Sequence, residues 1–447
     1  MDQIISFFVR RQHISQGPSL AAWMVWCLLA GGGPPYLHAA PQMPPVAQAA
    51  PSTAPTPLAA LIEEAEKNDS AILSAADAVR AAAQMPAQIS TLPDAHVSVQ
   101  MFSVGSPKPF AGFSNSDFAY IGFGVSQDLP YPGKRALRSA VAEREGDIRR
   151  QGAEMVRREE IEQLKEGYHR LAYLQQVMAI HHQHDALVLQ IAGAAEIRYR
   201  AGQGNQQDML RAQLEHSRVL RDISKNEQEA GEIQAELKRI LNRAQDSPDI
   251  MAEPLAPAPL ALQPDQLQAR VRDANPDVRE RAEMVRKAQA EVDLARREFR
   301  PDFGLSYMYQ RTNPDDFRAY YVFTFDVNFP RRKPRQAALA RAEIDVQRAR
   351  REQDAQTQFS LAALRKEIVA VRASDEQARI YREGLIPQAR AAYQAGMAAY
   401  ESGRADFQSV LSSAMDVLNL ELEYQQTLLT HQLGIVRIER LSGSVEP

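Results

Sequence analysis

The chain has 447 residues, a formal net charge of −4 at pH 7 and 24% charged residues. With so small a net charge we expect no strong attraction to nucleic acid or to acidic partners. The single cysteine, Cys27, excludes a disulfide framework and a cysteine-based metal site. The sequence has no catalytic or phosphate-binding motif, and we expect neither an enzyme nor a bound cofactor.

The N-terminus has the pattern of an export signal over residues 1–39. Basic residues precede an apolar core, Leu20–Ala30, which is shorter than the roughly 20 residues that a membrane-spanning helix needs. Lipidation of Cys27 is the less favoured alternative, because the bulky Trp26 precedes it where a lipoprotein signal has a small residue. Residues 40–57 are rich in alanine and proline and are predicted to be an unstructured lead-in.

The rest of the chain presents one pattern twice. Each copy has two short alternating segments, a long charged helix, the motif Tyr-x-x-Gly and a return helix. We predict a first repeat over residues 58–245 and a second over 264–442, joined by a proline-rich linker at 246–263. A duplicated unit of two strands and very long helices suits few functions.

Four segments alternate apolar and polar residues with a period of two, at about 95–104, 118–129, 303–311 and 319–329. Each is long enough to cross a bilayer as a tilted strand, and aromatic residues crowd one face. Four strands cannot close a barrel, and lipid does not tolerate an open edge, so several chains would have to share one. The alternative is an ordinary amphipathic sheet packed on a core.

Two stretches of about 65 residues lack proline, apart from Pro387, and as helices would approach 100 Å in length. Their apolar residues recur at spacings of three and four, which is typical of coiled coils. The glycine of each Tyr-x-x-Gly is predicted to end a helix in a sharp turn. The expected helices are Leu58–Ala83, Lys134–Tyr199, Gln206–Arg243, Pro264–Phe299, Arg335–Tyr400 and Asp406–Leu441.

From about Leu58 to Leu441 this ordered, duplicated set resembles the TolC family of outer-membrane efflux proteins. The segment Gln127–Arg135 is similar to the family's junction between strand and helix. Its second copy, Asn328–Lys333, departs from the pattern because it lacks the Pro-Gly pair. The run Pro-x-Pro-Gly-Lys-Arg within the first junction also resembles the heavy-metal, CusC-like branch of the family.

The resemblance implies an α+β membrane protein in the outer membrane of a Gram-negative bacterium. A homotrimer would form a twelve-stranded β-barrel that continues into a periplasmic α-helical barrel. Its tip would dock a periplasmic adaptor protein bound to an inner-membrane pump of the RND type. The chain would then be a passive, gated conduit that exports small molecules or metal ions. Type I protein secretion is one alternative, and a periplasmic coiled-coil scaffold is another from a different class.

The resemblance places a periplasmic tip and gate around the two Tyr-x-x-Gly turns. Some relatives carry aspartates just past the second turn, where this chain has Ser409 and Ser412. Asp208 occupies the repeat-equivalent of Ser409, so three copies of it could form an acidic ring; a solvated helix-cap aspartate is the alternative. The tip and gate candidates are Tyr199, Arg200, Gly202, Asp208, Tyr400, Glu401, Gly403, Arg404, Asp406, Ser409 and Ser412.

One histidine cluster stands apart from these motifs. His181, His184 and Asp185 lie at helical spacings of three and four, so they could share a face and bind a divalent metal. A conduit gains little from tight metal binding. We therefore favour a solvated polar face for these residues and predict no resident metal.

Overall fold

The computed structural model describes residues 55–102, 119–257, 263–312 and 319–443. The predicted export signal at 1–39 and all but the last three residues of the lead-in lie outside this range. The boundaries of the signal, the linker and the two repeats therefore stay predictions.

Four strands form one antiparallel sheet in the order β1-β2-β3-β4. The strands are β1 (His96–Phe102), β2 (Tyr120–Leu129), β3 (Asp302–Thr312) and β4 (Ala319–Asn328). Strands from the two repeats meet at the centre, where β2 pairs with β3. Among the described residues β1 and β4 are the outer strands, and each leaves one edge without a neighbour.

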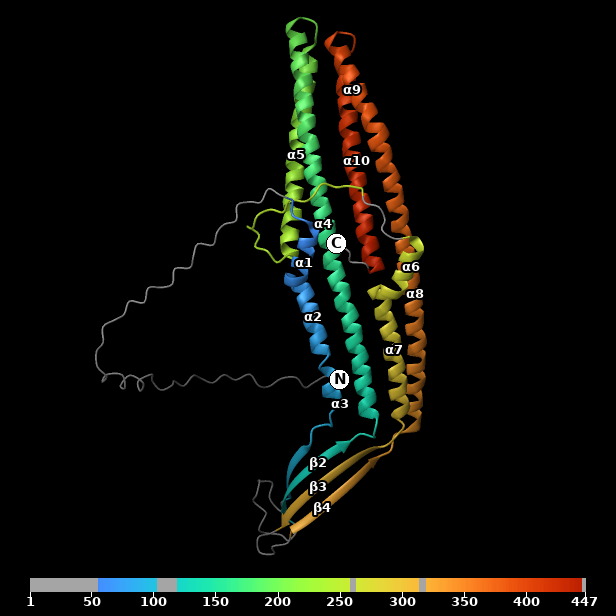
Figure 1. Ribbon diagram of the computed structural model, residues 1–447. Helices are drawn as coiled ribbons and strands as arrows, with labels where there is room; N and C mark the ends of the chain where they lie inside the picture. The colour runs from blue at the N-terminus through green and yellow to red at the C-terminus, as the bar shows by residue number, and fades with distance from the viewer. Residues whose placement is uncertain (1–54, 103–118, 258–262, 313–318, 444–447) are drawn as a thin grey trace, which may run out of the picture. The chain divides into compact units, whose positions relative to one another are not determined.

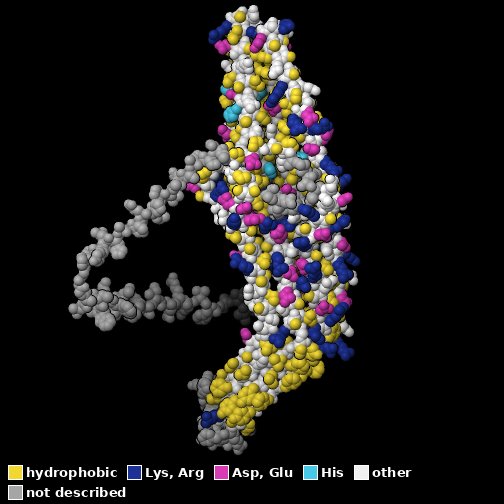
Figure 2. Space-filling model, in the orientation of Figure 1, with side chains coloured by type: hydrophobic (Ala, Val, Ile, Leu, Met, Phe, Trp, Pro, Cys, Tyr) yellow, Lys and Arg dark blue, Asp and Glu magenta, His cyan; other side chains and the backbone are white. Residues whose placement is uncertain are grey.

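One face of the sheet is covered with apolar side chains. Phe323 is 74% exposed, and Val97, Phe123 and Phe325 are also largely open to solvent. Figure 2 shows this surface as the largest continuous hydrophobic area in the view, over the strands. Cross-strand rings contact one another on it, as do Tyr307 and Phe323, whose centroids lie 4.7 Å apart with the ring planes tilted by 46°. An apolar face of this kind needs a partner other than water.

The helices lie alongside one another, with the sheet at one end of the bundle and two hairpin turns at the other (Figure 1). The longest has 67 residues and spans about 100 Å. No helix in the described ranges is both long and apolar enough to be a membrane span. The helices are α1 (Leu58–Asn68), α2 (Ser70–Ala82), α3 (Met85–Ser90), α4 (Lys134–Arg200), α5 (Gln206–Ile240), α6 (Pro264–Ala274), α7 (Pro276–Arg297), α8 (Arg332–Ile380), the π-helix η2 (Tyr381–Leu385), α9 (Ile386–Glu401) and α10 (Phe407–Ser442).

Each stretch expected to be a single helix before a strand pair is broken in two. The break falls at Asp69 in the first repeat and at Asn275 in the second. The Asp69 carboxylate accepts hydrogen bonds from the backbone N–H groups of Ala71 and Ile72, at 2.7 and 2.9 Å. The Asn275 side chain accepts one from Val278 at 3.2 Å. Both residues are buried N-caps, so they start a new helix where the sequence pattern predicted continuation.

The second long helix is not uniform either. Pro387 has no N–H to donate to the preceding turn, and the chain forms the π-helical turn η2 just before it. The helix continues through this irregularity from α8 to α9 without a loop. The predicted helix therefore exists, but its hydrogen-bonding pattern changes at the proline.

The core consists of several apolar clusters that follow the contacts between neighbouring helices. One joins α1, α4 and α5, and includes Leu61, Leu164 and Leu237, none of which has exposed surface. Another joins α6, α8 and α10 through residues such as Leu364 and Ile438. Burial of each leucine stabilises the fold by about 1.5–3 kcal/mol relative to exposure.

A buried lysine connects the sheet to the helices. Lys134, the first residue of α4, is only 1% exposed. Its ammonium group donates to the carbonyl oxygen of Arg300 at 2.8 Å and lies 2.9 Å from Oδ1 of Asp302 and 3.4 Å from Oε2 of Glu298. All three partners belong to the second repeat. This contact therefore fastens the start of the first long helix to the start of β3.

The Pro-Gly pair of the first junction has a conformational role. Gly133 lies at φ +90°, a left-handed conformation that costs other residues energy, and it is the N-cap of α4. The turn directs the backbone N–H of Tyr131 to Asp302 Oδ1 at 2.8 Å. The guanidinium of Arg297 lies over the Tyr131 ring, 5.7 Å from its centroid. Residues of the second repeat thus contact both the backbone and the ring of Tyr131 in this junction.

We expect Lys134→Met to destabilise the protein by about 3 kcal/mol or more, because it leaves the carboxylates at the junction without their buried counter-ion. Thermal unfolding of the detergent-solubilised protein, followed by circular dichroism, measures the change. Lys67→Met is the matched control: Lys67 pairs with Glu63 on the surface, where the effect should stay below about 0.5 kcal/mol. Equal effects of the two substitutions would contradict a special role for the junction.

Candidate functional site at the paired helix tips

The two Tyr-x-x-Gly turns have the same backbone geometry. Gly202 and Gly403 adopt φ +71° and +76°, the left-handed conformation that ends a helix. In each turn the glycine N–H bonds to the carbonyl three residues back, and the next N–H to the carbonyl five residues back. These bonds are Gly202 to Tyr199 (3.0 Å), Gln203 to Arg198 (2.8 Å), Gly403 to Tyr400 (3.0 Å) and Arg404 to Ala399 (2.8 Å). The predicted helix C-caps are confirmed.

The α4–α5 and α9–α10 hairpins pack against each other near their tips. Both turns lie at the end of the bundle opposite the sheet (Figure 1). An apolar cluster drawn from all four helices joins them. Its buried members are Ile191, Ala195, Ala212, Tyr393, Met397, Tyr400, Phe407, Val410, Ala414 and Val417.

Two arginines that sequence reasoning missed join the hairpins. Arg198 donates to the carbonyl oxygen of Tyr400, and its guanidinium lies over the Tyr400 ring, 4.7 Å from the centroid. Arg211 on α5 donates to Oε1 of Gln408 on α10 at 2.8 Å. Arg198 could have been found by comparing the two repeats, because the equivalent residue in the second repeat is Ala399.

The other charged candidates at the tips make local contacts. Arg200 pairs with Glu196 on its own helix at 2.5 Å, and both are exposed. Arg404 donates to the Ser402 hydroxyl at 3.0 Å. Glu401 is exposed at the end of α9. These side chains therefore present charge to the surroundings and do not hold the two hairpins together.

The acidic candidates behave differently in the two tips. Asp406 is the N-cap of α10, and its carboxylate accepts a hydrogen bond from the backbone N–H of Ser409 at 2.7 Å. Asp208 is half-buried in the first turn of α5. Burial raises the pKa of the Tyr400 phenol, Arg198 opposes the rise and the charge of Asp208 adds to it. The Asp208 carboxylate is thus near enough to the Tyr400 phenol to affect its pKa.

The remaining candidates flank these groups. Tyr199, Ser409 and Ser412 are exposed. The backbone N–H of Ser409 nevertheless donates to the Asp406 carboxylate. Tyr400 is buried beneath Arg198. The structure thus brings Tyr400 together with the missed Arg198.

The histidine cluster is not a solvated face, contrary to our prediction. His181 and His184 are buried, and both ring nitrogens of His184 lack a hydrogen-bond partner. Asp185 turns instead to His216 on α5, with its Oδ1 2.5 Å from Nδ1. The helices α5 and α10 pack along α4, and a hollow between α4, α9 and α10 reaches His184. In the described ranges no three His, Cys, Asp or Glu side chains are placed to hold a metal.

Burial dominates the protonation of these histidines. It lowers the pKa of His184, while the carboxylates of Glu215, Asp185 and Glu421 oppose the shift. It also lowers the pKa of His181. A proton on either ring would place a charge among packed helices, where it is poorly solvated.

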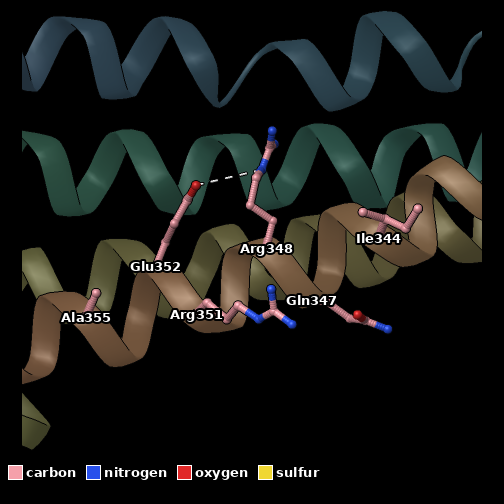
Figure 3. A pocket seen from close by; sticks show the side chains of 6 residues that line it. All are labelled: Ile344, Gln347, Arg348, Arg351, Glu352 and Ala355. Atoms are coloured by element: carbon pink, nitrogen blue, oxygen red, sulfur yellow. Dashed lines mark ion pairs between the residues drawn. The ribbon is translucent and has the colours of Figure 1, made fainter.

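Two surface hollows lie along the helices in the described part of the chain. The hollow in Figure 3 has a volume of about 280 Å³, and all the residues that line it come from α8. Among them Arg348 and Glu352 form an ion pair at 3.7 Å. A second hollow of about 340 Å³ lies between α4, α9 and α10 beside His184. The tips therefore remain the candidate functional site.

Comparison with protein families matches residues 267–438 to the model of the outer membrane efflux protein. This match lies within the predicted second repeat. A search of the curated proteins found no match.

Solved structures with the same fold cover most of the chain. The outer-membrane channel OprN has a TM-score of 0.74 and 17% identity, over 86% of this chain and 89% of its own. VceC from Vibrio cholerae has a TM-score of 0.73 and 18% identity, over 87% and 97%. CusC has a TM-score of 0.71 and 16% identity, over 86% and 91%.

We expect Arg198→Ala to loosen the contact between the two tips, because it removes the hydrogen bond and the cation–π contact to Tyr400. Spin labels at Ala201 and Ser402 should then report a broader distribution of distances by pulsed electron resonance. Arg200→Ala is the control, since Arg200 pairs only along its own helix, and it should leave the distribution unchanged. A distribution unaltered in both variants would refute the role of Arg198.

The buried His184 predicts a loss of stability in acid. Its pKa of 6.5 in the unfolded chain is lowered on folding. The unfolded state therefore binds protons more readily, and stability falls as the pH drops below about 6.5, by at most about 1.4 kcal/mol per pH unit for each such histidine. His184→Leu should reduce this pH dependence, measured as the unfolding midpoint between about pH 7.5 and 5. The exposed His182, changed to leucine, is the control, and an unaltered slope in His184→Leu would contradict the prediction.

Proposed function

We propose that this chain is an outer membrane efflux protein and forms the outer-membrane conduit of a tripartite efflux system. It exports small molecules or metal ions from the periplasm to the exterior. The observation that carries the proposal is the continuity of α4, whose 67 residues run without a break from the sheet to the tip. One rigid element of about 100 Å thus joins a membrane-facing end to a periplasmic end.

The sheet has the two faces that a membrane pore needs. Its apolar face, with Phe323 and Phe325 exposed, suits contact with lipid. The opposite parity of the same strand carries Thr324 and Asp326, which suit a water-filled lumen. Gly122 and Gly124 place no side chain on the corresponding face of β2, which leaves room there for water. We assign the apolar face to the outer-membrane lipid.

We infer a homotrimer, because a single copy leaves two strand edges and several apolar side chains without a partner. The open edges of β1 and β4 need partners in lipid. Large apolar side chains are also exposed along the helices, among them Leu210 and Leu214 on α5 and Phe359 on α8. Three copies would complete a twelve-stranded β-barrel and continue it as an α-helical barrel, which covers these residues.

The tips are the proposed docking end for the partners. Arg200, Glu401 and Arg404 present charges of both signs there, which suits a periplasmic adaptor protein. The adaptor would connect the conduit to an inner-membrane pump of the RND type. The pump supplies the energy, and this chain acts as a passive, gated channel and not as an enzyme.

We place the gate where the hairpins meet. Three copies of Asp208 around the threefold axis would form an acidic ring that attracts cations. Arg198 would hold the hairpins together in the closed state through Tyr400. Opening would then require the contact between α4 and α9 to separate while the junction at Lys134 stays intact.

Purified protein should behave as a trimer and form ion-conducting pores in planar lipid bilayers. Asp208→Ala should weaken the block of these pores by divalent cations, because the ring loses its charge. Ser412→Ala is the control, since this exposed position carries no charge. Conductance and block unaltered by Asp208→Ala would remove the gate role from this residue, and a monodisperse monomer without conductance would overturn the proposed function.

A further inference from the structure

The two repeats superpose strand by strand in their observed register. Matching Asp94 with Asp302 aligns β1 with β3, and matching Pro130 with Pro330 aligns β2 with β4. The observed pair His96–Ser126 then becomes Gly304–Asp326, and Gly304 does pair with Asp326. The alignment of the two repeats by their sequence motifs therefore agrees with the observed registers of the β1–β2 and β3–β4 pairs.

This correspondence extends to the open edges. The seam between the repeats pairs Asp128 of β2 with Gly304 of β3, and Gly124 with Met308. If each residue of such a pair is replaced by its counterpart in the other repeat, the pair Asp128–Gly304 becomes Asn328 of β4 opposite the partner subunit's His96. The second pair becomes Thr324 opposite the partner subunit's Gln100. The apolar parity continues across this edge, because Phe325 then lies opposite the partner subunit's Val99.

The same step predicts what lies at the second helix junction. Within the chain, the Asp302 carboxylate accepts the Tyr131 N–H and binds Lys134. Asp94 is the counterpart of Asp302, and Arg331 is the counterpart of Tyr131. The partner subunit's Asp94 would therefore face the start of α8.

The start of α8 is poor in anions. Arg331 is the N-cap of α8 and makes no side-chain capping bond, and the first turn contains no acidic residue. One carboxylate of the chain, Glu298, reaches this turn, 3.5 Å from Arg335, but it also pairs with Lys134. Arg332 and Lys333 are exposed there instead, at the positive end of the helix dipole. Positive charge at this end is unfavourable, so the site is suited to a carboxylate from outside the chain.

We propose that a second copy of this chain docks on the open edge of β4 through its β1, in the register above, and that its Asp94 caps α8 against Arg331, Arg332 and Lys333. This proposal rests on the trimeric conduit proposed above and names its contact. The helix junction within the chain is closed by one buried lysine, whereas the junction between copies would be closed by basic residues that are exposed in the single chain. The subunit seam is therefore the one that salt weakens.

Disulfide cross-linking tests the register in the full chain, in a Cys27→Ser background. Thr324→Cys combined with Gln100→Cys should give covalent dimers and trimers on oxidation, because directly opposed residues lie within disulfide reach. Thr324→Cys combined with His96→Cys is the control, with cysteines about 13 Å apart in the proposed register. Cross-linking of the control pair alone would overturn the register while the trimer stands, and absence of a trimer would overturn the proposed function as well.

Charge reversal tests the cap. Asp94→Arg should speed dissociation of the detergent-solubilised trimer about fivefold at low salt, and much less at high salt. Adding Arg332→Glu should restore the slower rate, whereas Asp246→Arg, on the exposed linker, should have no effect. If Asp94→Arg leaves dissociation unchanged and Arg332→Glu alone weakens binding to vesicles of anionic phospholipid, the basic cluster serves lipid headgroups and the proposal fails.

Discussion

The ammonium group of Lys134 is the contact on which the relation between sheet and helices depends. It is withdrawn from water almost completely, and this is tolerable only because Asp302, Glu298 and the Arg300 carbonyl surround it. The partners lie in the other repeat, so the contact joins the two halves at the point where strands become helices. A helix of about 100 Å amplifies any error of angle at its base, and the directional bonds of Lys134 hold that base against the second repeat.

The duplication supplies a scaffold, and the departures from it supply the specific contacts. Gly133 gives the first junction its tight turn, and the second junction has basic residues in its place. At the other end of the bundle Arg198 holds the tips together, while its counterpart Ala399 makes no such link. Two nearly equal units therefore differ at both ends of the long helices, where a pore would have to be held closed at one end and anchored at the other.

Sequence patterns predicted correctly those features that depend on neighbouring residues along the chain, namely the strands and the helix caps. Period-two alternation predicts strands because successive side chains point to opposite faces, and the observed strands show this separation. Glycine after a long helix predicts a left-handed cap, as Gly202 and Gly403 have. The breaks at Asp69 and Asn275 could have been predicted as caps, since Asp and Asn are preferred N-cap residues and Pro276 directly follows Asn275. The burial of His181 and His184 could not be predicted, because it depends on which helices cover that face.

By itself the sequence determined the duplicated architecture, the amphipathic strands and the sites of the helix turns, since each of these depends on neighbours along the chain. It also carried enough resemblance to indicate the family. Only the tertiary structure decided that β2 pairs with β3, that Lys134 is buried against the second repeat, and that Arg198 lies over Tyr400. These contacts join residues well over a hundred positions apart, and their energy comes from desolvation and geometry that no local pattern records.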